Sequence, residues 1–203
     1  DAGATRVAIR VEEGGRRLIQ VSDDGCGMDR DDALLCIEAH ATSKIQAAFD
    51  IDRIHTLGFR GEALASIAAV SHFQLQTRRA DDLCGTEILV EGGQLRDVRD
   101  CGCAPGTNVR VRNLFFNLPA RRKFLRQPAT EDAHIQETVL MQALAHAAVA
   151  FELSLNDQTV LQAHAGGDPA ARIGMLLGRD VYDGMIPVDY HEAGISVTGF
   201  VAR

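Results

Sequence analysis

The sequence predicts an α+β fold in which an antiparallel or mixed sheet carries helices on one face. Up to residue 112, about six or seven segments have the period-2 alternation of β-strands, and most are joined by short turns typical of hairpins. Helical segments come between groups of strands rather than after every strand, which differs from the pattern of a doubly wound parallel sheet. With 46% hydrophobic residues, the 203-residue chain can bury a sizeable core.

The first strand is expected over residues 5–11, and 17–22 reads as its return strand across a Glu-Glu-Gly-Gly turn. This hairpin runs directly into Asp23-Asp24-Gly25-Cys26-Gly27. A carboxylate at a strand end, beside backbone without side chains, can accept a hydrogen bond from an amino group such as that of adenine. A polar turn rich in Asp and Gly is the alternative explanation.

A helix is expected over residues 29–40, with Asp29 as its cap. It leads into Thr42-Ser43-Lys44, whose two hydroxyls and one ammonium suit phosphate oxygens. A plain helix exit with a solvated lysine explains the same residues. Residues 46–57 then read as a connector.

Two glycines bracket the next segment, Gly58-Phe59-Arg60-Gly61, and a helix is expected to begin at Glu62 and continue through Ala63 and Leu64. Glycine lets the main chain approach a ligand closely. The first turn of a helix offers unpaired N–H groups and the positive end of the helix dipole. The segment therefore predicts a phosphate-binding loop, with an ordinary loop-to-helix junction as the alternative.

The middle of the chain predicts more strands and one long helix. Thr130-Glu131-Asp132 is expected to cap this helix, which continues to about Ala150. The Gly92-Gly93 pair predicts a hairpin turn. The further strands are expected at 71–79, 85–91, 94–99, 106–112, 151–155 and 159–163.

The composition changes at residues 164–169, where a glycine pair precedes Asp168-Pro169. We therefore expect a first domain over residues 1–165 and the opening of a truncated second α+β domain over 166–203. A short helix and a strand are expected in this second part, at 170–177 and 195–202. Residue 1 is Asp rather than Met, which indicates a fragment.

The net charge of −7 argues against indiscriminate binding of nucleic acid over the whole surface. Residues 106–126 nevertheless contain six cations and no acid. The candidates for contacts with DNA phosphates are Arg121, Arg122, Lys123 and Arg126. The alternative is that these cations pair with local carboxylates and that the neighbouring phenylalanines, Phe115, Phe116 and Phe124, belong to the core.

The five cysteines are irregularly spaced, which favours reduced thiols over a disulfide framework. Cys101-Gly102-Cys103 lacks the spacing of a zinc site. No apolar run approaches the length needed to cross a bilayer, and no signal peptide is visible, so no membrane association is expected.

In chain order, these phrases closely resemble the MutL family of DNA mismatch repair ATPases, part of the GHKL group. Asp-x-Gly-x-Gly is shared across that group, whereas three phrases are specific to MutL-like proteins. They are Ala41-Thr42-Ser43-Lys44-Ile45, Gly58-Phe59-Arg60-Gly61-Glu62-Ala63-Leu64 and Asn117-Leu118-Pro119-Ala120-Arg121. The resemblance covers nearly the whole chain and implies a GHKL-type two-layer α/β sandwich.

By position, the resemblance implies that Asp23 reads the adenine amine, that Gly25 and Gly27 let the chain pass close to the nucleotide, and that Thr107 supports Asp23. It implies that phosphate is held by Thr42, Ser43 and Lys44 and by Gly58, Phe59, Arg60, Gly61, Glu62, Ala63 and Leu64. The implied cofactors are ATP and Mg²⁺.

In this family the general-base Glu and the Asn that binds Mg²⁺ lie just upstream of the position of Asp1. No catalytic residue and no metal ligand is therefore expected within residues 1–203. The resemblance implies a slow ATPase in the intact parent and little hydrolysis by this segment alone.

The family also implies partners. ATP is expected to order the lid, the segment around Gly58 to Gly61, after which two MutL-like chains associate as a homodimer or heterodimer. A MutS-like mismatch-recognition protein, downstream nuclease or helicase factors, and weak non-specific contact with DNA are implied as well. The implied location is the bacterial cytoplasm, in association with the nucleoid.

Three alternatives stay open. A type II topoisomerase or chaperone ATPase would share the fold, but Asn117-Leu118-Pro119-Ala120-Arg121 argues against it. A nucleotide-gated scaffold would bind ATP without needing hydrolysis. A DNA-binding module built on residues 106–126 is compatible with the ATPase interpretation.

Overall fold

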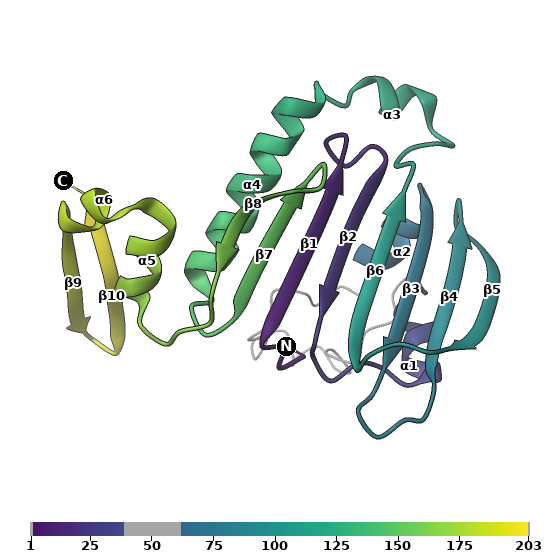
Figure 1. The fold of residues 1–203 in the computed structure, drawn as a ribbon, viewed down its shortest axis with the longest axis horizontal. Helices are drawn as coiled ribbons and strands as arrows, with labels where there is room; N and C mark the ends of the chain where they lie inside the picture. The colour runs from purple at the N-terminus through teal and green to yellow at the C-terminus, as the bar shows by residue number, and fades with distance from the viewer. Residues whose placement is uncertain (1, 39–61, 203) are drawn as a thin grey trace.

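The structure is a computed structural model that describes residues 2–38 and 62–202. Most strands belong to a single eight-stranded sheet (Figure 1). Its strands are β1 (Arg6–Glu12), β2 (Leu18–Asp23), β3 (His72–Arg78), β4 (Gly85–Glu91), β5 (Gln94–Cys101), β6 (Gly106–Arg112), β7 (Ala150–Leu155) and β8 (Gln158–Ala163). Across the sheet they follow the order β5-β4-β3-β6-β2-β1-β7-β8.

The sheet is mixed but mainly antiparallel, which confirms the predicted α+β class. Among the strands of the described residues, only β1 and β7 run parallel. Strand β6 lies between β2 and β3, so segments distant in sequence become neighbours. The hairpin turns predicted from glycine pairs are present, and Gly92 and Gly93 have φ of 57° and 83° between β4 and β5.

The period-2 alternation of strands such as β3 places their apolar side against the helices. In β3, Phe73, Leu75 and Thr77 are buried while their neighbours are partly exposed. The registers put Leu75 level with Val109 of β6 and with Ile88 of β4. These rows of inward side chains form one continuous apolar layer.

Helices α1 (Arg30–Leu35), α2 (Ala63–Ala68) and α4 (Pro128–Ala145) cover this layer and leave the other face of the sheet open (Figure 1). Ala33 of α1 and Ala68 of α2 pack with Phe73 and Leu75. Val139 and Ala143 of α4 pack with β1, β7 and β8 in a second cluster. The helices thus lie on one face, as predicted.

The open face of the sheet is polar. Its central group is Glu87, which is 3% exposed. The Glu87 carboxylate accepts hydrogen bonds from Gln74 Nε2 at 2.6 Å, Gln76 Nε2 at 2.7 Å and Arg99 Nε at 2.6 Å. These charge-assisted bonds lower the pKa of Glu87 against the opposing effect of burial.

The long helix departs from its prediction at both ends. Helix α4 begins at Pro128, where a missing N–H costs nothing, so the predicted cap at Thr130-Glu131-Asp132 was wrong. Glu131 instead accepts the N–H of Arg126 at 2.9 Å. The helix ends at Ala145 rather than near Ala150, and Ala150 begins β7.

The predicted helix over 29–40 is shorter in the structure. Asp29 caps α1 as predicted, with its Oδ1 accepting the Asp32 N–H at 2.9 Å. The helix ends at Leu35, and residues 39–40 lie outside the described part of the chain.

The C-terminal segment forms a separate unit of secondary structure. Helices α5 (Pro169–Leu177) and α6 (Arg179–Asp183) precede a two-stranded antiparallel sheet of β9 (Met185–Glu192) and β10 (Ile195–Ala202). The helix at 170–177 and the strand at 195–202 were predicted, whereas α6 and β9 were missed. The domain boundary at residue 165 stays a prediction. In the described part of the chain, no helix combines the length and the apolar character needed to span a bilayer.

Candidate functional site

Three polar side chains meet at one edge of the sheet, on the face that carries the helices. Asp23 ends β2, and its Cα partner on β6 is Thr107. Thr107 in turn pairs with Thr77 near the end of β3. Because side chains directly opposite one another point to the same face, an acid and two hydroxyls form a row beside the apolar layer.

Thr77 organises this row although it is completely buried. Its hydroxyl oxygen accepts the N–H of Met28 at 2.9 Å and lies 3.1 Å from the hydroxyl oxygen of Thr107. The Thr77 hydroxyl also donates to the carbonyl oxygen of Gly106 at 3.1 Å. With that donor committed, the Thr107 hydroxyl donates to Thr77 and presents its lone pairs outward.

The Asp23 carboxylate is half-buried and keeps acceptor capacity for a ligand. Oδ1 accepts the N–H of Gly25 at 2.9 Å, which turns the loop back beneath the carboxylate. Among the described residues, no cation forms an ion pair with Asp23. An ionised carboxylate has more acceptor sites than this one bond uses, so an amino group on a ligand is a suitable partner.

The glycines of the Asp23 loop are required by close backbone approach. Gly27 has φ of 67°, and a Cβ there would lie 2.0 Å from the carbonyl oxygen of Arg78. A Cβ on Gly25 would lie 2.8 Å from the carbonyl oxygen of Ala2. Gly106, immediately before Thr107, has φ of 113°, and its Cβ would lie 2.2 Å from the Asp23 carbonyl oxygen. The glycines therefore bring β2, β3 and β6 together at this edge.

Asp24, to which sequence reasoning assigned no role, fastens the N-terminal segment to the site. Its Oδ1 accepts the N–H groups of Thr5 at 2.7 Å and Arg6 at 2.8 Å. Its Oδ2 accepts the Thr5 hydroxyl. These bonds, led by the Thr5 hydroxyl, lower the pKa of Asp24.

Only some of the residues predicted to bind nucleotide lie in the described part of the chain. Asp23, Gly25, Gly27 and Thr107 meet at the sheet edge described above. Glu62 immediately precedes α2, Ala63 is its first residue, and Leu64 packs against the core cluster of Phe73 and Leu75. The remaining predicted phosphate residues lie outside the described part of the chain: Thr42, Ser43, Lys44, Gly58, Phe59, Arg60 and Gly61.

Thr77 is a site residue that sequence reasoning missed. A signal was present, because Thr77 continues the inward row of Phe73 and Leu75 and places a hydroxyl where the pattern calls for an apolar side chain. What the pattern could not indicate was the partner strand, since the pairing of β3 with β6 is a tertiary relationship.

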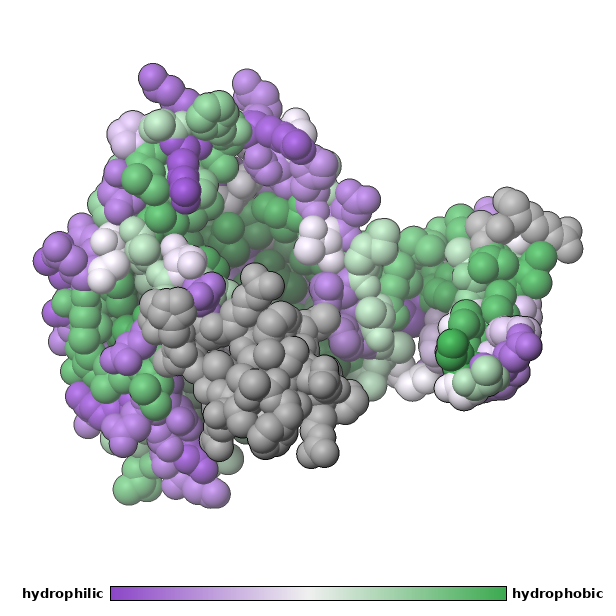
Figure 2. Space-filling model, turned by 180° about the vertical axis from the view of Figure 1, so that it is seen from behind, coloured by the Kyte–Doolittle hydropathy of each residue, from purple (hydrophilic) through white to green (hydrophobic). Residues whose placement is uncertain are grey.

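The helix face is hollowed, and its floor is apolar (Figure 2). The buried side chains of this layer come from both core clusters, including Val11, Leu153, Phe73 and Val111. By strand register, the row of Asp23, Thr107 and Thr77 lies next to the apolar row of Val21, Val109 and Leu75. Apolar surface beside a few placed polar groups is the usual composition of a site for a planar, partly apolar ligand such as a nucleobase.

The predicted DNA-contacting residues lie on α3 (Pro119–Lys123) and just after it. Arg121, Arg122 and Lys123 are exposed, and no carboxylate of the described residues pairs with them. Arg126 differs, because its guanidinium bonds to His134 and its N–H to Glu131. Phe124 is 85% exposed, so the alternative that placed it in the core was wrong. Phe116 instead packs edge-on against His72, with ring centroids 4.3 Å apart.

The described residues do not form a magnesium site by themselves. No group of three or more His, Cys, Asp or Glu side chains in ranges 2–38 and 62–202 is arranged to hold a metal ion. A Mg²⁺ ion here would need ligands beyond these side chains.

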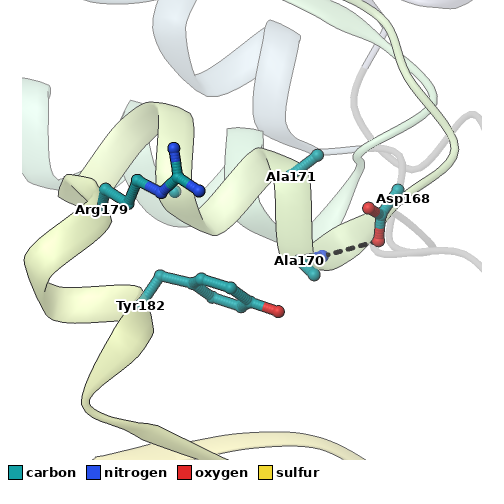
Figure 3. Close-up of a pocket in the computed structure, with 6 residues that line it drawn as sticks. Asp168, Ala170, Ala171, Arg179 and Tyr182 are labelled. Atoms are coloured by element: carbon teal, nitrogen blue, oxygen red, sulfur yellow. Dashed lines mark hydrogen bonds between the residues drawn. The ribbon is translucent and has the colours of Figure 1, made fainter.

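A pocket of about 300 Å³ lies in the C-terminal segment, between α5 and α6 (Figure 3). Asp168, Arg179 and Tyr182 contribute its polar groups. The Asp168 carboxylate already accepts the N–H of Ala170 at 3.0 Å and so serves as the cap of α5. None of the strand-edge residues lines this pocket, and we place the candidate site at the strand edge because the acid and hydroxyls converge there.

The mixed sheet, its single helical layer and the acid-and-hydroxyl row at the strand ends define a two-layer sandwich of the GHKL ATPase class. A scan against protein-family models finds no match. The chain is 48% identical over 202 residues to the DNA mismatch repair protein MutL of Geobacter sp. strain M21, and 48% identical over 203 residues to that of Opitutus terrae. These alignments cover the whole chain and 31% and 32% of the relatives, so the chain spans about a third of their length.

Among solved structures, the Aquifex aeolicus MutL ATPase domain complexed with ADP superposes with a TM-score of 0.78 at 30% identity. The match covers 100% of this chain and 71% of that domain. The chain belongs to the MutL family of DNA mismatch repair proteins, and it corresponds to the ATPase region of that family.

Proposed function

We propose that this chain binds the adenine nucleotide of a MutL-type ATPase at the neighbouring ends of strands β2, β6 and β3. The observation that carries the proposal is the row of Asp23, Thr107 and Thr77, in which a carboxylate with spare acceptor capacity stands beside a hydroxyl held by buried Thr77. A similar domain of the family is complexed with ADP, which supports the ligand class.

In this proposal Asp23 accepts a hydrogen bond from the exocyclic amine of adenine. Thr107 supplies a second polar contact, since its lone pairs face outward when it donates to Thr77. Gly25 and Gly27 carry no side chain, so the loop packs closely on the neighbouring backbone and leaves space for the base against the apolar side chains of the sheet. Phosphate contacts are assigned to Thr42, Ser43 and Lys44 and to the segment from Gly58 to Leu64.

The proposed activity of the intact protein is slow ATP hydrolysis with Mg²⁺, which would offset the negative charge of the phosphates when bound. The general base and the Mg²⁺-binding Asn are assigned, from the family resemblance, to positions upstream of Asp1. We therefore expect residues 1–203 alone to hydrolyse little ATP. Turnover by the purified 203-residue chain that is abolished by Asp23→Ala would contradict this expectation.

Nucleotide binding is proposed to act as an assembly switch of the order–disorder kind. ATP would order the lid and favour association of two MutL-like chains. The paired chains would then contact a MutS-like mismatch-recognition protein and downstream nuclease or helicase factors, in the cytoplasm and near the nucleoid. The proposal rests on Gly58 and Gly61 of the lid, because glycine lets a loop change its backbone conformation and approach phosphate closely.

The test of nucleotide binding is Asp23→Asn in the full-length protein, with ADP affinity measured by titration calorimetry. Asn keeps an acceptor oxygen but loses the negative charge, so a bond worth about 1.5–3 kcal/mol becomes one worth about 0.5–1.5 kcal/mol and affinity should fall by about fivefold to tenfold. Asp31→Asn is the matched control, because Asp31 is an exposed acid in the first turn of α1. Equal ADP affinity for wild type and Asp23→Asn would refute the proposed role.

A second candidate function is non-specific DNA binding by α3. The observation that favours it is the exposure of Arg121, Arg122 and Lys123 without carboxylate partners among the described residues, next to the exposed ring of Phe124. Unpaired cations can neutralise phosphates, and an exposed aromatic ring can lie against a base or sugar. This function is compatible with nucleotide binding, because α3 belongs to a different part of the fold.

A further inference from the structure

Two cysteine side chains lie in contact at the end of β5. Cys101 is the last residue of the strand, and its Sγ lies 3.9 Å from the Sγ of Cys103. Both residues are partly exposed free thiols. The pair is packed against β4, because a Cβ placed on Gly85 would lie 2.3 Å from Cys103 Sγ. Neither cysteine takes part in the nucleotide site described above.

The backbone between the two cysteines can accommodate a bond between them. A disulfide needs Cα atoms no more than about 7 Å apart. Residues two positions apart along a chain cannot exceed about 7 Å even when fully extended. Gly102 lies outside β5, and a Cβ on it would meet nothing within 4 Å, so the segment has room to bend.

The environment gives the two sulfurs different roles. The Cys101 thiol donates to the sulfur of Cys103, and burial raises the pKa of Cys101 to about 11, with further contributions from Cys103 and the Glu87 carboxylate. Cys101 therefore stays protonated at neutral pH. Because the Cys101 S–H points at Cys103 Sγ, we assign the first attack to Cys103 and the second to Cys101.

We propose that Cys101 and Cys103 form a reversible intramolecular disulfide, with a low-molecular-weight disulfide of the glutathione type as oxidant. The Cys103 thiolate attacks one sulfur of the oxidant, so the oxidant's S–S bond breaks and one thiolate departs. Cys101 then attacks Cys103 Sγ, and its proton passes to the second departing thiolate. The protein loses two protons and two electrons, and the oxidant becomes two thiols.

Cys101 and Cys103 are connected through the backbone to the proposed nucleotide site at Asp23 and Thr107. This part of the inference rests on the proposed function. Arg78 Nε donates to the Cys103 carbonyl oxygen at 2.7 Å. The carbonyl oxygen of Arg78 lies over Gly27, in the loop that follows Asp23. Closing the disulfide bends residues 101–103, which lead into Gly106 and Thr107, so oxidation weakens nucleotide binding.

The test equilibrates the full-length protein with glutathione and glutathione disulfide, blocks remaining thiols by alkylation, and analyses tryptic peptides by mass spectrometry. Trypsin releases Asp100–Arg110, which holds Cys101 and Cys103 and no other cysteine. We expect this peptide to become two hydrogen atoms lighter and to resist alkylation. The peptide of exposed Cys84 should only gain glutathione, which makes it the internal reference.

Two variants separate the steps. Cys101→Ser lacks the resolving thiol, so glutathione should accumulate on Cys103. Cys103→Ser lacks the attacking thiol, so modification of Cys101 should be lost. An Asp100–Arg110 peptide that stays reduced while Cys84 is fully modified, or that carries glutathione in the wild type without an internal disulfide, would overturn the proposal.

The coupling is tested by ADP titration of the reduced and oxidised wild type, with Cys103→Ser as the matched control. We expect several-fold weaker ADP binding on oxidation in the wild type and no change in the variant. An unchanged affinity in the oxidised wild type would overturn the coupling. Failure of the nucleotide proposal is recognised separately, because it leaves the mass of Asp100–Arg110 unaffected and appears as unchanged ADP affinity in Asp23→Asn.

Discussion

The hydroxyl oxygens of Thr77 and Thr107 lie 3.1 Å apart on the neighbouring strands β3 and β6. Thr77 is completely buried, whereas Thr107 is only partly buried and stands beside Asp23. The buried hydroxyl also accepts the Met28 N–H, which follows directly after Gly27. One side chain thus connects the two parts of the candidate site, the Asp23 loop and the start of β6.

Thr77→Val keeps the shape of this side chain and removes its hydroxyl. Met28 then loses its acceptor in a part-buried position, so we expect the free energy of unfolding to fall by about 1–3 kcal/mol. We also expect weaker ADP binding, because Thr107 is no longer oriented. Urea unfolding and calorimetry measure the two effects. Thr77→Ser is the control, since it keeps the hydroxyl and should retain ADP affinity; a Val variant with wild-type values would show that the network is dispensable.

Gly27→Ala tests the close backbone approach at the Asp23 loop. The new Cβ would lie 2.0 Å from the Arg78 carbonyl oxygen, so β3 or the loop has to move. Gly3→Ala is a matched control, because Gly3 has φ of 66° against 67° for Gly27 but open space around it. The positive φ alone costs about 1–2 kcal/mol. We expect a clearly larger loss of unfolding free energy for Gly27→Ala, and equal losses in urea titrations would contradict the steric argument.

Asp24 predicts a pH dependence of stability. Its pKa is lowered in the folded protein by hydrogen bonds from Thr5 and Arg6. The stabilisation is therefore present above the pKa of the unfolded chain, about 3.9, and is lost as pH falls through the folded value. We expect Asp24→Asn to be less stable than wild type at pH 7 and the difference to shrink as pH falls below the unfolded value of about 3.9. Unfolding curves at both pH values measure it, with Asp31→Asn as control; a difference that persists at low pH would argue against this linkage.

Arg172 of α5 joins the C-terminal segment to the first part of the chain by hydrogen bonds. It is 2% exposed, and its guanidinium donates to the carbonyl oxygens of Ala147 at 2.8 Å, of His146 at 3.3 Å and of Val149, just beyond the end of α4. Burial lowers the pKa of Arg172. We expect Arg172→Ala to leave these carbonyls without partners and to increase amide hydrogen exchange in α5. Arg179→Ala, at an exposed arginine of α6, serves as control. Unchanged exchange in α5 would mean that apolar packing alone holds the segment.

Arg122→Glu tests the proposed DNA contact of α3. Loss of one phosphate contact should weaken non-specific binding and reduce the slope of log K against log salt by about 1. Arg96→Glu makes the same charge change at an exposed arginine of β5 and should have a smaller effect. Fluorescence anisotropy with a labelled duplex, measured over a range of salt concentrations, gives both slopes. Identical slopes for the two variants would indicate a general charge effect instead of a contact at α3.

Much of the secondary structure could be predicted because its causes are local. Side-chain alternation placed β3 and β6, and the Asp29 cap set the start of α1. The ends of α4 could not be predicted in this way. Gln127 and Pro128 set its start, while its end is followed by carbonyls that bond to Arg172 from a distant helix. Strand β9 was missed although it pairs along its full length with β10.

The sequence by itself determined the chemical groups of the candidate site: a carboxylate at a strand end, glycines after it, and a threonine that follows another glycine. Only the tertiary structure decided that Asp23, Thr107 and Thr77 stand level with one another on one face. It also decided that Gly27 faces the Arg78 carbonyl and that Phe124 is exposed. The physical reason is that backbone preferences and side-chain periods act over a few residues, whereas strand register and burial depend on which distant segments pack together.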